Sequence, residues 1–125
     1  MDKIFFTIGS ILGGIAVATG AFGAHGLKKL VTPELLDTWE KAVRYQMYHA
    51  LALLALAWAV THWSEQIKLL TVGGWLFLAG VILFSGSLYI LVLSGVKWLG
   101  AITPLGGMAF VAGWACLALA ALRST

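Results

Sequence analysis

The sequence predicts an all-α integral membrane protein: a transmembrane bundle of four helices, with a short amphipathic interfacial helix between the first two spans. Of its 125 residues, 61% are hydrophobic and only 10% are charged, whereas a soluble domain is roughly half apolar and about a quarter charged. The mean hydropathy is +0.96. A soluble domain of this length has too little interior to bury so much apolar surface, so lipid must cover it. Residues 1–125 are expected to form a single transmembrane domain.

Four apolar segments are long enough to cross the hydrocarbon core, which takes about 20 residues in helical form. They cover residues 4–24, 46–63, 69–96 and 98–122. The first is longer than the apolar region of a cleaved signal peptide, which is about 7–15 residues, so we expect it to be a span. In the last segment, Thr103-Pro104 favours a helix start at this point over a kink in one longer helix.

The polar segment between the first two spans carries the signals of a helix over residues 33–45. Thr32 can cap the helix, Pro33 suits its first position, and Glu34 places an acid in the first turn. Apolar side chains recur on one side and charged ones on the other. We therefore expect an amphipathic helix that lies at the membrane interface and runs into the second span.

Small residues recur at steps of three and four in the first and last spans and at steps of seven in the third. Between helices in lipid, small residues mark the places where backbones approach closely. The glycines therefore predict a closely packed bundle, and those expected to pack helices together are Gly9, Gly13, Gly20, Gly23, Gly73, Gly80, Gly106 and Gly113.

The distribution of basic residues gives a weak indication of orientation. With four spans, five of the eight Lys and Arg lie on the side that holds the polar segment, and three lie on the side of the termini. The positive-inside rule then places the polar segment in the cytoplasm and both termini outside. Because the basic residues are scattered beside the spans, they favour lipid headgroups and exclude a nucleic-acid surface. Trp39 and Trp98 are expected to anchor one interface.

Polar side chains gather in one half of the predicted bundle. When the four spans are threaded alternately, one half holds nearly all polar intramembrane side chains, and these usually face the bundle interior or a wet cavity. Two interpretations stay open: bonds that hold the helices together, which we favour, and a functional polar pocket. The candidate pocket residues are His25, Tyr45, Gln46, His49, Ser85, Ser87, Tyr89 and Thr103.

No pattern in the sequence indicates catalysis, a metal or a cofactor. Two histidines without a nearby intramembrane carboxylate or thiolate pair make a poor zinc site. No serine sits in a nucleophile elbow, and no acid is placed to orient a histidine. The single cysteine, Cys116, excludes an internal disulfide and is expected to be a packing residue. We expect no catalytic residues, no bound metal and no cofactor.

Four ordered blocks of sequence resemble a known membrane family. They are Gly20–Leu27 (GAFGAHGL), Tyr45–Leu51 (YQMYHAL), Phe84–Tyr89 (FSGSLY) and Thr103–Gly107 (TPLGG). Together they are similar to the family called domain of unknown function 423, and the resemblance covers essentially the whole chain. It implies a small four-helix protein of a bacterial inner membrane and no particular activity. The family's motif positions match here as His25, Tyr45, Gln46, His49, Ser85, Ser87, Tyr89, Thr103 and Pro104.

Three functional hypotheses follow. The first is a non-enzymatic bundle that binds a small molecule, a lipid or a partner protein. The second is a small oligomeric transporter or channel with a histidine-lined polar pocket, since histidine titrates near physiological pH. A membrane enzyme ranks last, because the nearest acids, Asp37 and Glu40, fall on the solvent side of the interfacial helix. Membrane lipids are the expected partners, and a homo-oligomer or a membrane-protein partner stays open.

Overall fold

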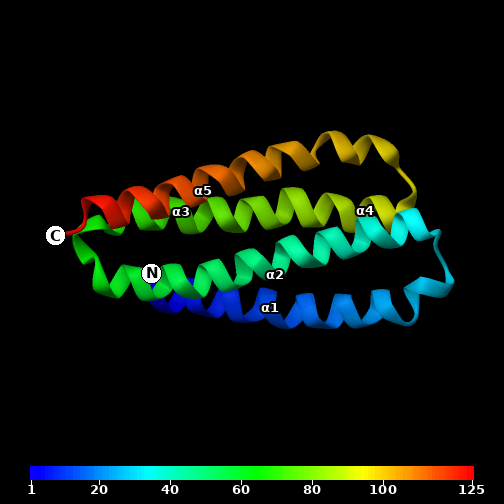
Figure 1. Ribbon diagram of the computed structural model, residues 1–125, viewed down its shortest axis with the longest axis horizontal. Helices are drawn as coiled ribbons and strands as arrows, with labels where there is room; N and C mark the ends of the chain where they lie inside the picture. Colours follow the sequence, from blue (N-terminus) through cyan, green and yellow to red (C-terminus); the bar gives the residue numbers. More distant parts are fainter.

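The computed structural model describes all 125 residues and contains helices and turns without any strand (Figure 1). The long elements are α1 (Asp2–Ala24), α2 (Pro33–His62), α3 (Ile67–Gly80), a π-helical turn η3 (Val81–Gly86), α4 (Ser87–Ser94) and α5 (Thr103–Arg123). Three short 3₁₀ turns connect them: η1 (Leu27–Lys29), η2 (Ser64–Gln66) and η4 (Lys97–Ala101). The predicted all-α fold is confirmed.

The elements form four antiparallel rods, because α3, η3 and α4 follow one another as one rod (Figure 1). Both termini and the α2–α3 connection lie at one end of the molecule. The α1–α2 and α4–α5 connections lie at the other end. The most extensive helix contacts join α1 to α2 and α3 to α5, while α2 also touches α3, η3 and α4. The fold is thus two closely packed pairs of helices laid side by side.

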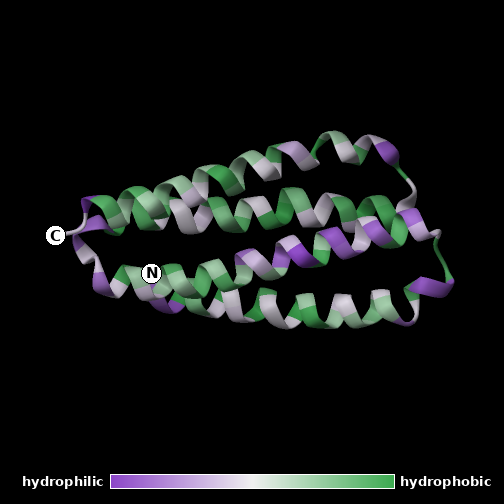
Figure 2. Ribbon diagram, viewed as in Figure 1, coloured by the Kyte–Doolittle hydropathy of each residue, from purple (hydrophilic) through white to green (hydrophobic).

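Three rods are long and apolar enough to cross a membrane: Asp2–Lys29, Ser64–Ser94 and Lys97–Arg123. In α2 the apolar sequence is confined to the second half, because charged and polar side chains occupy its first turns (Figure 2). The chain is therefore a membrane protein by the length and composition of these three helices.

The segment predicted as a short interfacial helix, residues 33–45, is not a separate element. It forms the first turns of α2, which continues unbroken to His62. Its start is as expected, since the Thr32 hydroxyl accepts a hydrogen bond from the Leu35 amide at 3.2 Å. The segment packs along α1, and Trp39, predicted as an interface anchor, is only 4% exposed. The glycines of α1 explain the difference, because they make room for this face of α2 inside the bundle.

Glycines lie where the two helices of each pair come closest. A Cβ atom on Gly9 would stand 2.8 Å from the Ala50 carbonyl oxygen, and one on Gly23 would stand 2.7 Å from the Trp39 ring. Between α3 and α5, a Cβ on Gly113 would meet the Phe77 ring at 2.7 Å.

The other glycines predicted to pack helices differ in how much room they have. Atoms of α5 lie close to Gly73 and Gly80, and atoms of η3 lie close to Gly106. The side chain of Val43 lies near Gly20. A Cβ added to Gly13 would meet its nearest atom, the Cβ of Ala50, at 3.9 Å, which is an ordinary van der Waals distance. Gly74, on which the Phe5 ring packs, is not among the glycines predicted to pack helices.

Two local features set the geometry beside α5. The π-helical turn η3 places Phe84 against Gly106 of α5 and turns Ser85 toward α2. α5 begins at Thr103 with Pro104 in its first turn, where the missing amide hydrogen costs no helical hydrogen bond.

Candidate functional site

The eight predicted pocket residues do not line one cavity. Tyr45 and His49 line a groove between α2 and α5, and Gln46, Ser87 and Tyr89 line a different groove beside α1. His25, Ser85 and Thr103 line neither of these grooves. The predicted residues therefore fall into four groups: an interior network, a group of interhelical bonds, two residues of the groove between α2 and α5, and one isolated histidine.

The interior network joins three helices through Gln46, a side chain that is 2% exposed. Its amide nitrogen donates to the Leu12 carbonyl oxygen of α1 at 2.8 Å. The Tyr89 hydroxyl of α4 donates to its amide oxygen at 2.7 Å and lies 3.3 Å from the Thr19 hydroxyl of α1. These bonds provide hydrogen-bond partners for the buried side-chain amide of Gln46, and lipid could not provide such partners.

Two serines bond helices together at the π-helical turn. The fully buried Ser85 hydroxyl donates to the Ala42 carbonyl oxygen of α2 at 2.7 Å. Ser87 and Thr103 pair through their hydroxyl oxygens at 2.7 Å and so tie α4 to the start of α5. Both arrangements satisfy polar groups within the bundle.

His49 is buried on the side of α2 that faces α5, with 4% of its surface exposed. Its Nδ1 lies 2.6 Å from the Tyr45 carbonyl oxygen, and its Nε2 accepts a hydrogen bond from the Trp114 indole at 3.1 Å. A carbonyl only accepts and an indole N–H only donates, so these partners assign the neutral imidazole with its proton on Nδ1. The ring also stacks on Phe110, with centroids 3.5 Å apart.

These contacts leave His49 without a free nitrogen. A metal ion or a transferred proton would have to displace the indole of Trp114 from Nε2. The arrangement therefore suits a fixed wall of a binding site better than a group that titrates or ligates during function.

His49 forms part of the floor of a groove on the outside of the bundle, which we call the lateral groove. It encloses about 930 Å³ between α2 and α5, and eight of its eleven lining residues are hydrophobic. Tyr45 stacks on Phe84 with centroids 4.5 Å apart, which makes one aromatic wall. Gly107, Met108 and Val111 form the opposite side on α5.

The lateral groove opens on the surface that faces lipid in a membrane-spanning bundle. Tyr48 is 51% exposed and Met108 is 68% exposed at its edges. The two tyrosine hydroxyls at this surface, those of Tyr45 and Tyr48, make no hydrogen bond within the chain and so are free to contact a ligand. Chemically, the groove offers apolar and aromatic contact with two hydroxyls.

His25 lies apart from the other candidates. It is an exposed residue directly after the last turn of α1, where its backbone amide caps the helix by contacting the Ala21 and Phe22 carbonyls. Nothing in the structure brings it near His49.

Two tryptophans and a threonine make contacts that the sequence did not predict. The Trp114 indole donates to His49, and its ring lines the lateral groove. The Trp39 indole donates to the Thr19 carbonyl oxygen at 2.8 Å, beside the interior network. The sequence holds no local signal for these pairs, because their partners are 20 or more residues away.

No cluster of three or more His, Cys, Asp or Glu side chains that could hold a metal ion occurs in the structure. The thiol of Cys116 is free and half-buried.

Comparison with known proteins places the chain among membrane proteins. The model of a family described as "Protein of unknown function (DUF423)" matches residues 19–107. A UPF0382 membrane protein of Staphylococcus aureus is 49% identical, with 97% of each chain covered. The UPF0382 membrane protein YwdK of Bacillus subtilis is 46% identical over 97% of this chain and 98% of its own length. No solved structure matches.

Proposed function

Because the chain belongs to the DUF423 family of membrane proteins, we propose a binding function and a location rather than a reaction. The protein crosses a bacterial cell membrane four times and holds the apolar part of a membrane amphiphile in its lateral groove. It acts as a non-enzymatic binding protein.

The direction of the helices supports the fourth span. α1 and α3 are each in a rod long and apolar enough to cross the membrane, and they run in the same direction (Figure 1). A chain that crosses twice in one direction must return between the two crossings, and α2 is the only long helix between them. Its polar first turns then lie at the membrane face, where Glu34, Asp37 and Arg44 can reach water.

One observation carries the binding function: an aromatic groove of about 930 Å³ opens sideways on the surface of the bundle. Ligand sites are typically clefts of about 300–1,000 Å³ with mostly apolar walls and a few placed polar groups. The lateral groove has this character, with Tyr45 and Tyr48 as its exposed polar groups. A sideways opening suits a molecule that is dissolved in the membrane.

The geometry of His49 supports a binding role over the histidine-based transporter. A buried neutral imidazole with both nitrogens occupied has no position for a proton in transit. The oligomeric transporter stays a prediction, and so does the cytoplasmic placement of the α1–α2 connection.

Filling the lateral groove from Gly107 tests the proposal. This glycine lines the groove, and a Cβ added to it would meet nothing within 4 Å. Gly107→Leu should therefore fold normally and occupy the space that a ligand needs. Gly14→Leu is the matched control, since Gly14 has equally open surroundings on α1, outside the groove.

The readout is native mass spectrometry of the protein released from bacterial membranes in mild detergent. The parent and Gly14→Leu should carry the same co-purifying amphiphile, and Gly107→Leu should carry at least about tenfold less, as expected when the apolar contact of the groove is lost. If all three proteins retain the same bound molecules, the lateral groove is not the binding site.

A further inference from the structure

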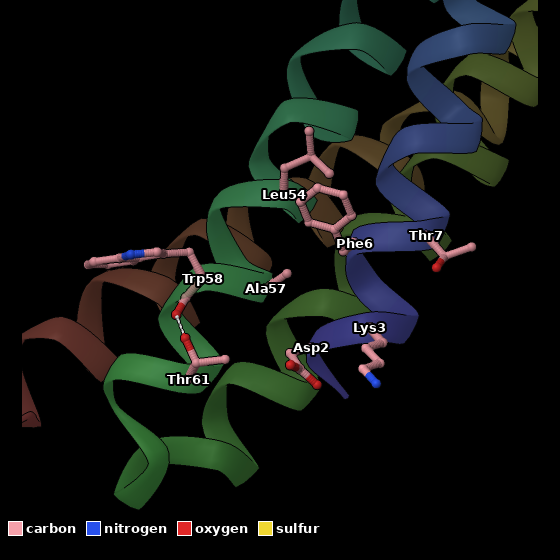
Figure 3. Close-up of a pocket in the computed structure, with 8 residues that line it drawn as sticks. All are labelled: Asp2, Lys3, Phe6, Thr7, Leu54, Ala57, Trp58 and Thr61. Atoms are coloured by element: carbon pink, nitrogen blue, oxygen red, sulfur yellow. Dashed lines mark hydrogen bonds between the residues drawn. The ribbon is translucent and has the colours of Figure 1, made fainter.

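A second groove lies at the end of the bundle that holds the termini, between the start of α1 and the end of α2 (Figure 3). We call it the terminal groove; it encloses about 530 Å³, and half of its eight lining residues are hydrophobic. It shares no residue with the lateral groove.

The polarity of the terminal groove changes along the helix axis. Asp2, Lys3 and Thr61 lie at the end of the bundle, while Phe6 and Leu54 lie deeper and face each other between the two helices (Figure 3). Thr61 and Leu54 are seven residues apart on α2, which corresponds to about 10 Å of helix. This is the order of a phospholipid, whose headgroup lies at the surface and whose acyl chain runs inward.

Small side chains create the groove. Gly9 brings α1 and α2 together, but nearer the terminal end the facing residues of α2 are Ala57 and Thr61. Phe5 cannot fill the space, because it turns to the other side of α1 and packs on Gly74 of α3. The helices therefore leave an apolar channel whose floor is Ala57.

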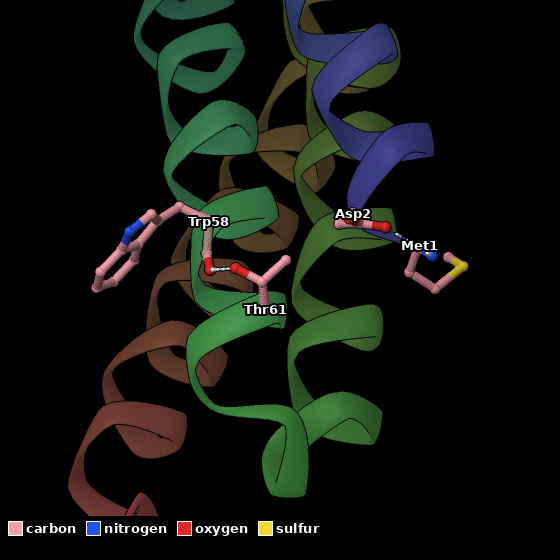
Figure 4. A network of polar contacts seen from close by, with 4 residues as sticks. All are labelled: Met1, Asp2, Trp58 and Thr61. Carbon is pink, nitrogen blue, oxygen red and sulfur yellow. Dashed lines mark hydrogen bonds and ion pairs between the residues drawn. The ribbon is translucent and has the colours of Figure 1, made fainter.

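The Asp2 carboxylate supplies the hydrogen-bond acceptors at the mouth of the terminal groove. Thr61 donates its only hydroxyl hydrogen to the Trp58 carbonyl oxygen at 2.7 Å (Figure 4). This hydroxyl is turned along α2 and also lies 3.1 Å from His62 Nδ1, so the methyl group of Thr61 faces α1 (Figure 3). Asp2 lies on the side of α1 that faces α2, and its carboxylate makes only a 3.8 Å ion pair with the Met1 ammonium (Figure 4).

A cation completes the mouth on its other side. Lys3 extends from the outer side of the same turn of α1 (Figure 3). Its ammonium group is a flexible point charge suited to a phosphate. The mouth thus presents acceptors toward α2 and a cation away from it.

From this charge arrangement we propose that the terminal groove binds a phospholipid with a primary-ammonium headgroup. The ammonium donates to Asp2, the phosphate pairs with Lys3, and one acyl chain lies over Phe6, Leu54 and Ala57. A trimethylammonium headgroup carries the same charge without an N–H donor, and a glycerol headgroup lacks the positive charge. Headgroup chemistry therefore distinguishes this site from general lipid contact.

The test uses three dioleoyl lipids with identical chains: phosphatidylethanolamine, phosphatidylcholine and phosphatidylglycerol. Each is titrated onto the full chain in detergent and followed by native mass spectrometry. The Gly107→Leu variant is titrated in parallel, so that binding in the lateral groove is counted separately. Phosphatidylethanolamine should bind about tenfold more tightly than the other two, the effect of one charge-assisted hydrogen bond.

Substitutions assign the preference to the mouth of the groove. Asp2→Asn should abolish it, whereas Asp37→Asn, which changes an exposed acid on α2 at the other end of the bundle, should preserve it. Thr61→Val keeps the shape of the side chain and should also preserve the preference, because the Thr61 hydroxyl is turned toward the Trp58 carbonyl and not toward the groove. Equal binding of the three lipids, tighter binding of phosphatidylglycerol, or an unchanged preference in Asp2→Asn would each overturn the proposal.

Discussion

The contact of α2 with α1 and its contact with α5 are built in opposite ways. Against α1, glycines bring backbone atoms so close that a Cβ on Gly9 would stand 2.8 Å from the Ala50 carbonyl oxygen. Against α5, rings span the gap: His49 stacks on Phe110 and accepts a bond from Trp114. The first contact is closed where Gly9 and Gly23 lie and opens only at its terminal end, whereas the second leaves the lateral groove open.

With the proposed binding function, this difference lets one helix serve both stability and binding. Helices in lipid gain little from burying apolar surface, so close packing and interhelical hydrogen bonds hold them together. Small residues allow that packing, whereas large rings keep backbones apart and form pockets. The α1–α2 contact should therefore tolerate substitution poorly, and the α2–α5 contact should tolerate it well.

The largest expected effect is at Gly9. In Gly9→Ala, the new methyl group meets a backbone oxygen and the Cβ of Leu53 at 3.1 Å, so the helices must separate. We expect a loss of about 2 kcal/mol in the free energy of unfolding, which is typical of an overpacked core. Reversible unfolding in detergent micelles, followed by circular dichroism, gives the value.

Gly14→Ala is the control for this experiment, because a Cβ at Gly14 meets nothing within 4 Å. Alanine also favours the helix over glycine, so this variant should be unchanged or more stable by up to about 1 kcal/mol. Equal stability of Gly9→Ala and Gly14→Ala would mean that the α1–α2 contact is not close-packed.

The contrast also explains how much the sequence could predict. The all-α fold and three apolar spans follow from composition and segment length, which local sequence contains. The spacing of Gly9 and Gly23 indicated which side of α1 approaches another helix. It did not indicate which residue would fill the space, and Trp39, expected at an interface, packs there instead.

The candidate site was less predictable, because it depends on which helix face meets which. Alternating the direction of the four predicted spans puts Gln46, His49 and Tyr89 in one half of the bundle. Gln46 and His49 are three residues apart on α2, a spacing that does not by itself assign them to different neighbours. In the structure Gln46 turns toward α1 and α4, and His49 turns toward α5. A single polar pocket was therefore expected where the structure has an interior network and a separate groove.

A second prediction concerns the interior network. Tyr89→Phe removes the donor to Gln46 and leaves a buried amide oxygen unpaired. The free energy of unfolding should fall by about 1 kcal/mol, within the range measured for interhelical hydrogen bonds in membranes. Tyr48→Phe removes an exposed hydroxyl without a partner and should leave stability unchanged. A neutral Tyr89→Phe would mean that the Tyr89–Gln46 hydrogen bond adds nothing to the packing of α4 on α2.

The smallest expected effect is at the lateral groove, in Trp114→Phe. The substitution removes the indole donor to His49 Nε2, but Trp114 is 46% exposed and the stack of His49 on Phe110 remains. We expect a loss of only about 0.6 kcal/mol, the average for one interhelical hydrogen bond in a membrane protein. Reversible unfolding in detergent micelles gives this loss in the free energy of unfolding, which is then compared with the loss in Gly9→Ala. A loss as large as that of Gly9→Ala would show that α2 is held as firmly by α5 as by α1, and the lateral groove would then be a structural seam rather than a site left open for a ligand.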